Sequence, residues 1–325
     1  SKRPNVVVVG VSTMDEHGYC CVSCDLQWEM ESFYSADKII FEVNPSIPHL
    51  PGDCALPVAM ADVIIESDLS LYELQDPPIG EAEKTIAQYA AEMVHDGDCI
   101  QLGFGGIPNA IGFELMNRHD LGIHTEQIGA SMAHMIQSGV VTNRYKNLDR
   151  GWSVGAFIIA DNFTYNYVNN HPRIMMRRGR YTNDPMVIAQ QDNMVSINAA
   201  LQIDLTGQVA AEALGHIQFS GTGGATDYAY GAYHSRGADT VSLYSNPAGL
   251  EIHILVGFLT QLGAEVGVSN SDQVLHALLH GALTQLSNAV LGDDHVGQVP
   301  PPCSTSQSSK IASPPKLTRF SGASL

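Results

Sequence analysis

The stretch "DCIQLGFGGIPNAIGFELMN", residues 98–117, decides the fold expected of this chain. It opens with a short apolar run typical of a buried strand, continues through a glycine turn, and ends in the apolar spacing of a helix. A helical pattern precedes it at residues 81–98, with acids in the first turn and Gly97 at the end, and a further strand follows at residues 121–127. Helix, strand, glycine turn, helix and strand predict an open, mostly parallel α/β sheet. Ligands of such sheets collect at the carboxyl ends of the strands.

The N-terminal part predicts a first α/β domain. Three apolar runs read as buried parallel strands: "NVVVVGVS", "KIIFEVN" and "ADVIIESD". "QDPPIG", residues 75–80, is the best domain boundary. We therefore expect a first domain at residues 1–76, a second at 77–250, and a divergent part with a Pro/Ser-rich tail at 251–325. The first domain is expected to be N-terminally incomplete, because its first strand has nothing before it to pair with.

The charge and hydropathy of the sequence argue against nucleic-acid binding and against a membrane-spanning segment. The 325 residues are 44% apolar and carry 16 Lys and Arg against 34 Asp and Glu, a formal charge of −18. So acidic a globular chain is not expected to bind nucleic acid, whose phosphates need a basic surface. No run of eighteen apolar residues predicts a membrane span, and no leader is visible at Ser1. A cytoplasmic location is predicted, with an organellar matrix as the alternative.

Six cysteines bear on redox and metal chemistry: Cys20, Cys21, Cys24, Cys54, Cys99 and Cys303. Cys21 and Cys24 form a single C-x-x-C, and a zinc site needs a second pair at suitable spacing. The pattern favours ordinary reduced thiols over a redox or metal site, and so a reducing compartment and no bound metal.

Two glycine turns could carry chemistry, "GFGGIP" at residues 103–108 and "SGTGGATD" at residues 220–227. Backbone N–H groups in such turns can hold a phosphate, a carboxylate or a developing oxyanion. The alternative is that both are tight turns in which glycine supplies the backbone angles. The first turn lacks the third glycine of a dinucleotide fingerprint and the Gly-Lys-Ser/Thr of a P-loop, so neither nucleotide site is indicated.

Glu126 stands just after the strand-like run at residues 121–125. It is either a solvated strand-end carboxylate or a nucleophile that attacks an activated acyl carbon beside a turn of backbone donors. His124 is a candidate general base, although a packed histidine is the commoner case. His17 favours a structural role over a catalytic one.

Seven segments, taken together and in order, resemble the acetyl-CoA hydrolase/transferase family, nearest to the 4-hydroxybutyrate and butyrate:acetate CoA-transferases. The resemblance runs from about Asn5 to about Ser245. The segments are "MDEHGYC", "FEVNPSIPHLPGD", "PPIGEAEKTIAQYAAEMVHDGDCIQLGFGGIPNAIG", "DLGIHTE", "GVVTNRYK", "NDPMVIAQQDNMVSINAALQIDLTGQVAAE" and "SGTGGATDYAYGA".

The resemblance implies two open, mostly parallel α/β domains of the CoA-transferase type and a site built on Glu126, the nucleophile that carries a glutamyl-CoA thioester. It implies that one loop contacts CoA and that a second closes over the thioester. The first loop is Gly103, Phe104, Gly105, Gly106 and Ile107, and the second includes Ser220, Gly221, Gly223 and Gly224. The chain departs from the family at Ala225, where Gln is usual, and at Ala248, where Lys is usual.

The expected activity is that of a CoA-transferase. It would move CoA between a short-chain acyl-CoA and a carboxylate of the acetate, butyrate or 4-hydroxybutyrate type, in a homo-oligomer. Two alternatives remain, an acyl-CoA hydrolase on the same fold and a non-catalytic CoA-binding fragment. Stimulation by free carboxylates distinguishes the transferase from the hydrolase, whereas CoA binding without turnover indicates the fragment.

Overall fold

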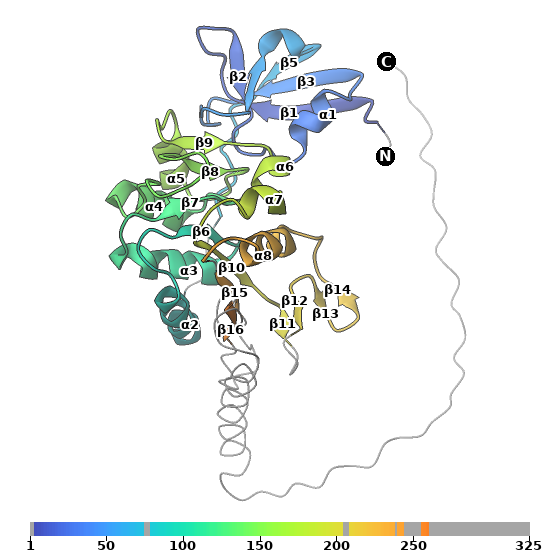
Figure 1. Ribbon diagram of the computed structural model, residues 1–325. Coiled ribbons are helices and arrows are strands. Elements are labelled where there is room, and N and C mark those ends of the chain that lie inside the picture. Colours follow the sequence, from blue (N-terminus) through green and yellow to red (C-terminus); the bar gives the residue numbers. More distant parts are fainter. Residues whose placement is uncertain (1–2, 75–78, 204–207, 238, 244–254, 260–325) are drawn as a thin grey trace, which may run out of the picture. The chain divides into compact units, whose positions relative to one another are not determined.

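The computed structural model describes residues 3–74, 79–203, 208–237, 239–243 and 255–259 (Figure 1). The boundary expected at Pro77 and Pro78, the family departure at Ala248, Cys303 and the Pro/Ser-rich tail lie outside the described residues. Both sheets described below belong to one compact unit, Ser1–Ser271.

The first sheet consists of three parallel strands in the order β1-β3-β5. Between these strands in the sequence, β2 and β4 form a small antiparallel pair. These elements run β1 (Val6–Val11), β2 (Tyr19–Cys21), α1 (Glu29–Phe33), β3 (Lys38–Val43), β4 (Ala55–Pro57), the 3₁₀ turn η1 (Val58–Met60) and β5 (Val63–Glu66). The three apolar runs are therefore parallel strands as predicted.

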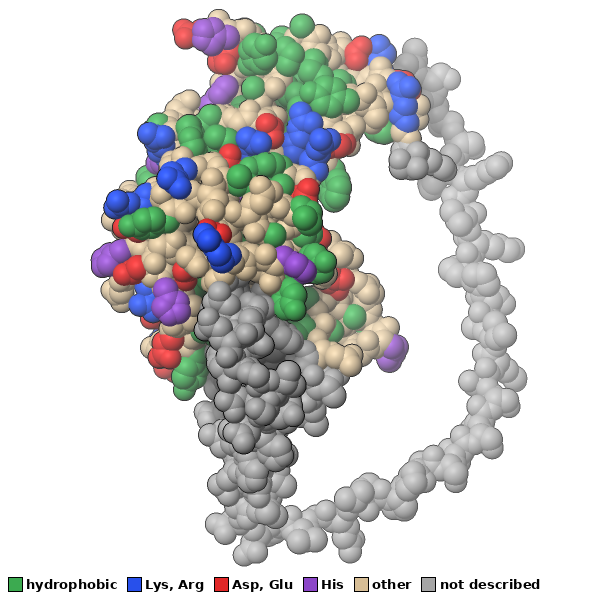
Figure 2. Space-filling model, viewed as in Figure 1, with side chains coloured by type: hydrophobic (Ala, Val, Ile, Leu, Met, Phe, Trp, Pro, Cys, Tyr) green, Lys and Arg blue, Asp and Glu red, His purple; other side chains and the backbone are tan. Residues whose placement is uncertain are grey.

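The prediction that these three strands are buried is wrong for β5 and for one face of β1. Val6 and Val8 of β1 are 52% and 58% exposed, and every residue of β5 is exposed, whereas Phe41 of the central strand β3 is buried. Hydrophobic side chains are accordingly visible over this sheet in Figure 2. An apolar sequence allows a strand to be buried, but the strand is buried on both faces only where other elements pack against each face.

The second sheet has the order β16-β15-β10-β6-β7, parallel except where β16 pairs antiparallel with β15. Its strands are β6 (Cys99–Leu102), β7 (Gly122–Ile123), β10 (Met194–Ala199), β15 (Asp239–Leu243) and β16 (Leu255–Leu259). All four residues of β6 are buried, so both faces of the sheet are covered there. The open, mostly parallel α/β sheet predicted from residues 98–117 is confirmed.

Alternate residues of β6 face different helices. Ile100 joins the main core with α2 (Glu81–Glu92) and α3 (Gly106–Glu114), whereas its neighbour Cys99 joins a smaller cluster with Tyr228 of α8 (Ala225–Tyr233). Because successive side chains of a strand point to opposite faces, α2 and α3 cover one face and α8 covers the other. This arrangement brings the N-terminus of α8 to the sheet that carries the glycine turn.

Two predicted elements are longer than those observed. The helix over residues 81–98 ends at Glu92, where the chain turns, and the Asp98 carboxylate accepts a hydrogen bond from the His95 N–H. The strand over residues 121–127 keeps only Gly122–Ile123, because the chain then leaves β6 and forms isolated bridges to the region of Val154 and Phe157. Glu126 therefore lies beyond the end of strand β7 and outside the sheet.

The remaining elements connect these layers. They are η2 (Leu115–Asn117), α4 (Ala130–Ser138), β8 (Ser153–Gly155), α5 (Asn162–Val168), β9 (Ile174–Met176), α6 (Gly179–Thr182), α7 (Pro185–Ile188), β11 (Gln202–Ile203), β12 (Val209–Ala210), β13 (Ala213–Leu214) and β14 (Ile217–Gln218). Of the helices in the described ranges, none has the length and apolar character that crossing a bilayer requires.

Candidate active site

Glu126 lies at a bend between the bridges at His124 and Gln127, and hydrogen bonds to main-chain carbonyls hold this segment in place. Its own carbonyl accepts hydrogen bonds from the N–H groups of Ala156 (2.7 Å) and Phe157 (3.0 Å). Beneath the segment, the buried Lys146 ammonium donates to the carbonyls of Ile123 and Trp152, each at 2.8 Å. The backbone of the glutamate is thus fixed before its side chain makes any contact.

Three donors from separate parts of the chain converge on the Glu126 carboxylate. Gln27 Nε2 donates to Oε1 at 2.8 Å. The side chain of Asn183 and the backbone N–H of Gly224 also lie near this carboxylate, close enough to lower its pKa. A methyl group at Gly224 would lie 2.5 Å from Glu126 Oε2 and 2.5 Å from Asn183 Nδ2, so the three groups meet at one point.

Local structure explains the orientation of the second and third donors. Thr182 Oγ1 donates to Asn183 Oδ1 at 2.9 Å, which turns the amide nitrogen of Asn183 toward the glutamate. Gly224 is the residue before α8, so its N–H belongs to the helix N-terminus, where the helix dipole favours negative charge. An amide side chain and a helix N-terminus therefore face the same carboxylate oxygen.

The pKa of Glu126 is raised above its usual value. Burial is the largest cause, and the hydrogen bonds from Asn183, Gln27 and Gly224 oppose it. A carboxylate that is partly removed from water but still offered several donors keeps a negative charge in a site where that charge is poorly hydrated. Such a group is a better nucleophile than a solvated glutamate.

His124 is packed and does not act as a base toward Glu126. Its Nε2 lies 3.0 Å from the carbonyl oxygen of Thr182, its ring contacts Tyr181 and Tyr228, and its side chain is fully buried. Burial lowers the pKa of His124 to about 3, so the ring is neutral. His17 is exposed beside Glu16, on the loop before β2, and takes no part in this site.

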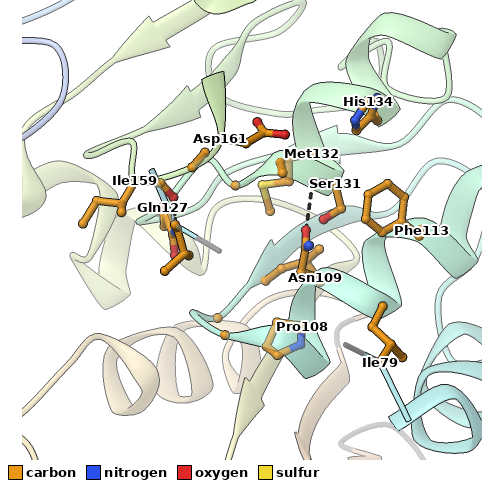
Figure 3. A pocket seen from close by; sticks show the side chains of 17 residues that line it. Ile79, Pro108, Asn109, Phe113, Gln127, Ser131, Met132, His134, Ile159 and Asp161 are labelled. Atoms are coloured by element: carbon orange, nitrogen blue, oxygen red, sulfur yellow. Dashed lines mark hydrogen bonds between the residues drawn. The ribbon is translucent and has the colours of Figure 1, made fainter. Parts of the chain in front are cut away.

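The first glycine turn lies on a cavity of about 440 Å³. Gly103 and Gly105 line this cavity together with Pro108 of α3, and Figure 3 shows the first turns of α3 and α4 around it. Asn109 Oδ1 accepts a hydrogen bond from the N–H of Ser131 at 2.9 Å, which joins the two helix beginnings. The cavity is therefore bordered by two helix N-termini.

Gln127 connects the cavity to Glu126 along the chain. Its side chain lines the cavity and donates to the carbonyl of Ile159 at 2.8 Å, whereas Glu126 is not among the lining residues. The rest of the cavity wall carries the His134 and Asp161 side chains and several apolar residues. These apolar residues include Leu74, Ile79, Leu102, Phe113, Met132 and Ile159.

The structure divides the predicted site residues into three groups. Gly224 contacts the Glu126 carboxylate, and Gly103 and Gly105 line the cavity. The others lie elsewhere on the two turns: Phe104 is 55% exposed at the tip of the first turn, and Ser220, Gly221 and Gly223 are exposed on the second. Gly106 and Ile107 open α3. The catalytic and CoA-binding roles given to these residues stay predictions.

Gln27, Asn183 and Thr182 are site residues that the sequence did not single out. Gln27 lies in "CDLQWEM", a segment without a recognisable motif, and it reaches Glu126 across 99 positions. Asn183 had a weak signal, since it precedes Asp184 and Pro185, a typical helix start. Over the described ranges, no three His, Cys, Asp or Glu side chains gather as a metal site.

Comparison with known proteins identifies the family. Residues 161–270 match the acetyl-CoA hydrolase/transferase C-terminal domain. The chain is 43% identical over 227 residues to a succinyl-CoA:cyclohexane-1-carboxylate CoA transferase of Geobacter metallireducens, covering 70% of this chain and 52% of that protein. The chain belongs to the acetyl-CoA hydrolase/transferase family. A 4-hydroxybutyrate coenzyme A transferase of Clostridium kluyveri is 36% identical over 268 residues, covering 82% of this chain and 62% of that one.

Solved structures of similar proteins agree with the fold of this family member. RipA from Yersinia pestis has a TM-score of 0.71 at 39% identity, over 73% of this chain and 54% of RipA. A 4-hydroxybutyrate CoA-transferase from Porphyromonas gingivalis has a TM-score of 0.66 at 33% identity, over 73% of this chain and 57% of that one. The chain thus spans between about half and three fifths of the length of these relatives.

Proposed function

We propose that this chain carries the nucleophile of a CoA-transferase that moves CoA between a short-chain acyl-CoA and a free carboxylate. The observation that supports it is the convergence of Gln27, Asn183 and Gly224 on the partly buried Glu126 carboxylate. Names of the relatives, which include a 4-hydroxybutyrate and a butyrate transferase, favour the same chemistry.

The first half-reaction exchanges the acyl group for CoA on the glutamate. Glu126 attacks the thioester carbonyl of acyl-CoA, the carbon–sulfur bond breaks, and an acyl-glutamyl anhydride and CoA thiolate result. The thiolate then attacks the glutamyl carbonyl of this anhydride. The donor carboxylate leaves, and a glutamyl-CoA thioester remains on Glu126.

The second half-reaction runs the same steps toward the acceptor. An acceptor carboxylate attacks the glutamyl-CoA carbonyl and expels CoA thiolate, which forms a new anhydride. The thiolate then attacks the acyl carbonyl of that anhydride, releasing the new acyl-CoA and restoring the Glu126 carboxylate. Each thioester activates its own carbonyl, so these steps need no metal.

The donors around Glu126 suit the tetrahedral intermediates of this sequence. Whenever a thiolate or carboxylate attacks the glutamyl carbon, negative charge develops on the glutamate oxygen. The Gly224 N–H and the Asn183 amide lie at that oxygen, and preorganised donors of this kind each contribute about 3 kcal/mol to lowering the barrier. Gln27 holds the other oxygen and thereby orients the carboxylate.

We place part of the CoA substrate in the cavity of about 440 Å³ beside the first glycine turn. The Gly103–Gly105 turn, in which the Gly103 N–H is bonded to the Ile197 carbonyl, borders it together with the beginnings of α3 and α4, and its remaining wall combines apolar side chains with those of His134 and Asp161. This combination suits an amide-bearing, flexible chain such as the pantetheine arm. A homo-oligomer remains part of the proposal and is checked by sedimentation of the purified protein.

The experiment that tests the proposal is intact-mass analysis of the protein after incubation with acetyl-CoA or butyryl-CoA and no acceptor. A CoA adduct that acetate removes supports the transferase. Borohydride reduces the thioester to an alcohol, which fixes the position of the label for peptide mapping. Glu126→Ala is expected to give no adduct and no exchange while keeping the thermal unfolding temperature of the unaltered protein.

Other outcomes would replace the proposal. An adduct mapped to Cys20, Cys21 or Cys24 would make the protein a cysteine acyltransferase. Steady release of CoA without an adduct, unaffected by acetate, would indicate a hydrolase. Binding of CoA without turnover of any acyl-CoA would indicate a non-catalytic protein.

A further inference from the structure

Two buried cysteines that the proposed reaction does not use lie side by side between neighbouring strands. The sulfur atoms of Cys21 and Cys54 are 3.0 Å apart, and both side chains are fully buried. Cys21 ends β2, and Cys54 directly precedes β4, which pairs antiparallel with β2. The N–H of Val22 donates to the carbonyl of Cys54 at 2.9 Å, so the backbones beside the two thiols are also joined.

The surroundings keep both sulfurs directed at each other. The Cys54 thiol donates to the carbonyl of Leu50 at 3.1 Å, and the N–H of Leu50 donates to the Cys21 sulfur at 3.5 Å. The hydrogen bond with Cys54 lowers the pKa of Cys21, while that bond and burial raise the pKa of Cys54. The Cys21 thiol also lies 3.4 Å from the Leu50 carbonyl oxygen, so both thiols share one acceptor and stay in contact with each other.

The pairing differs from the one that the sequence suggests. Cys21 and Cys24 have C-x-x-C spacing, but the partner of Cys24 is Ser23, and burial raises the pKa of Cys24 to about 12. Cys20 points to the other side of β2, as alternate residues of a strand do. Two sulfurs at 3.0 Å need to approach by only about 1 Å to reach disulfide distance.

We propose that Cys21 and Cys54 form a reversible disulfide when the protein meets a hydroperoxide. One of the two sulfurs, as its thiolate, attacks the peroxide, so that a sulfur–oxygen bond forms, the oxygen–oxygen bond breaks, and the departing oxygen leaves as an alcohol or water. The other sulfur then attacks the sulfenic acid, the sulfur–sulfur bond forms, and water leaves with the proton of that second thiol. Two electrons pass from the thiols to the peroxide, and a dithiol reductant reverses the reaction.

The proposed bond lies close in sequence to two residues, Gln27 and Asp53, that contact other parts of the chain. Gln27, which holds Glu126, follows Cys21 by six positions, and Asp53, next to Cys54, forms an ion pair with Arg177 at 3.3 Å. A covalent bond between Cys21 and Cys54 would fix the relative positions of the two segments that carry Gln27 and Asp53. It closes a loop that contains Gln27, and cross-links of this kind reduce the freedom of the unfolded chain.

The test is a peptide map of the full chain under non-reducing conditions. The reduced protein is treated with hydrogen peroxide, its free thiols are blocked, and it is digested with trypsin. Cys20, Cys21 and Cys24 fall in the peptide of residues 3–38, and Cys54 falls in that of residues 39–84. We expect these two peptides to be joined after peroxide, with fragmentation placing the bond on Cys21, and to separate again after dithiothreitol.

Four variants assign the bond. Cys20→Ala and Cys24→Ala are the matched controls and should keep the link, whereas Cys21→Ala and Cys54→Ala should lose it. A link that survives in Cys21→Ala, or a Cys21–Cys24 bond within the first peptide, would overturn the proposal. Because a buried substitution can impair folding, the map of the unaltered protein is decisive on its own: no link at peroxide concentrations that oxidise its methionines would also overturn it.

Discussion

The two glycine turns read alike in the sequence, yet different neighbours lie against them. At Gly224 a methyl group would meet the Glu126 carboxylate and the Asn183 amide, each at 2.5 Å, while the backbone angle φ is an ordinary −81°. At Gly105 a methyl group would meet nothing within 4 Å, but φ is +119°. Gly224 is needed for space at the Glu126 carboxylate, whereas Gly105 is needed for its backbone angle.

The largest effect is expected from Gly224→Ala. Its methyl group would push apart the carboxylate and the Asn183 amide and so disturb two donors of the oxyanion. We expect kcat for exchange between acyl-CoA and acetate to fall by about a thousandfold, in the range reported for loss of an oxyanion donor. Exchange assays, with the thermal unfolding temperature as a check on folding, measure this. Near-normal kcat in a folded Gly224→Ala protein would remove the turn from the chemistry.

Asn183→Ala should have the next largest effect, because it removes one donor and leaves the other two. We expect kcat to fall by about a hundredfold with little change in stability. Asn166→Ala, an exposed asparagine on α5, is the matched control and should retain full activity. Equal activities of the two variants would show that the amide beside Glu126 only fills space.

Gly105→Ala should affect stability rather than chemistry, if its glycine serves the backbone. A residue forced to a positive φ of this kind costs about 1–3 kcal/mol of unfolding free energy. Chemical denaturation measures the loss, and Gly129→Ala supplies the control, since Gly129 lines the same cavity with φ of −96° and open space around its Cβ position. A similar loss in both variants would refute the backbone explanation.

The pH dependence of exchange should distinguish the turns further. Glu126 is reactive when ionised, and because its pKa is raised, chiefly by burial, activity should fall on acidification at a higher pH than an ordinary glutamate predicts. Gly224→Ala disturbs a donor that lowers this pKa, so its acid limb should move still higher. Gly105→Ala should leave the limb in place, and pH profiles of kcat/KM report all three. An acid limb at the usual glutamate pKa would contradict the assignment.

The smallest effect is expected from Gly221→Ala, on the same turn as Gly224. Gly221 is exposed, and a methyl group there would meet nothing within 4 Å. Stability should change by less than about 0.5 kcal/mol and kcat by less than about twofold. If Gly221→Ala were instead as damaging as Gly224→Ala, the whole turn would have to close on the substrate, as the family resemblance implied.

Sequence periodicity predicted the strands but not all of their surroundings. β6 is buried on both faces as expected, because α2, α3 and α8 supply cover. β5 is equally apolar at its first three positions and is exposed along its whole length, and β1 is exposed at Val6 and Val8. Burial depends on packing partners from distant parts of the chain, which a local pattern does not contain.

The site was predictable only where the chain carries local signals. Glu126 and Gly224 stand in recognisable segments, a strand end and a glycine turn before a helix. Gln27 and Asn183 reach Glu126 through tertiary contacts across 99 positions in one case and through the short helix α6 in the other. An amide side chain has no sequence signature as a carboxylate donor, so these two residues had to be found in the structure.

The wide separation of the donors along the chain makes the surroundings of the Glu126 carboxylate depend on complete folding. Gln27 and Gly224 lie on opposite sides of Glu126 in the sequence, and both must dock before the carboxylate acquires its neighbours. Contacts of such long range close large loops and form late in folding. Local opening of either segment, at a free energy below that of global unfolding, would remove the donors from the Glu126 carboxylate while most of the protein stayed native. Activity should therefore disappear at a lower denaturant concentration than helical circular dichroism does.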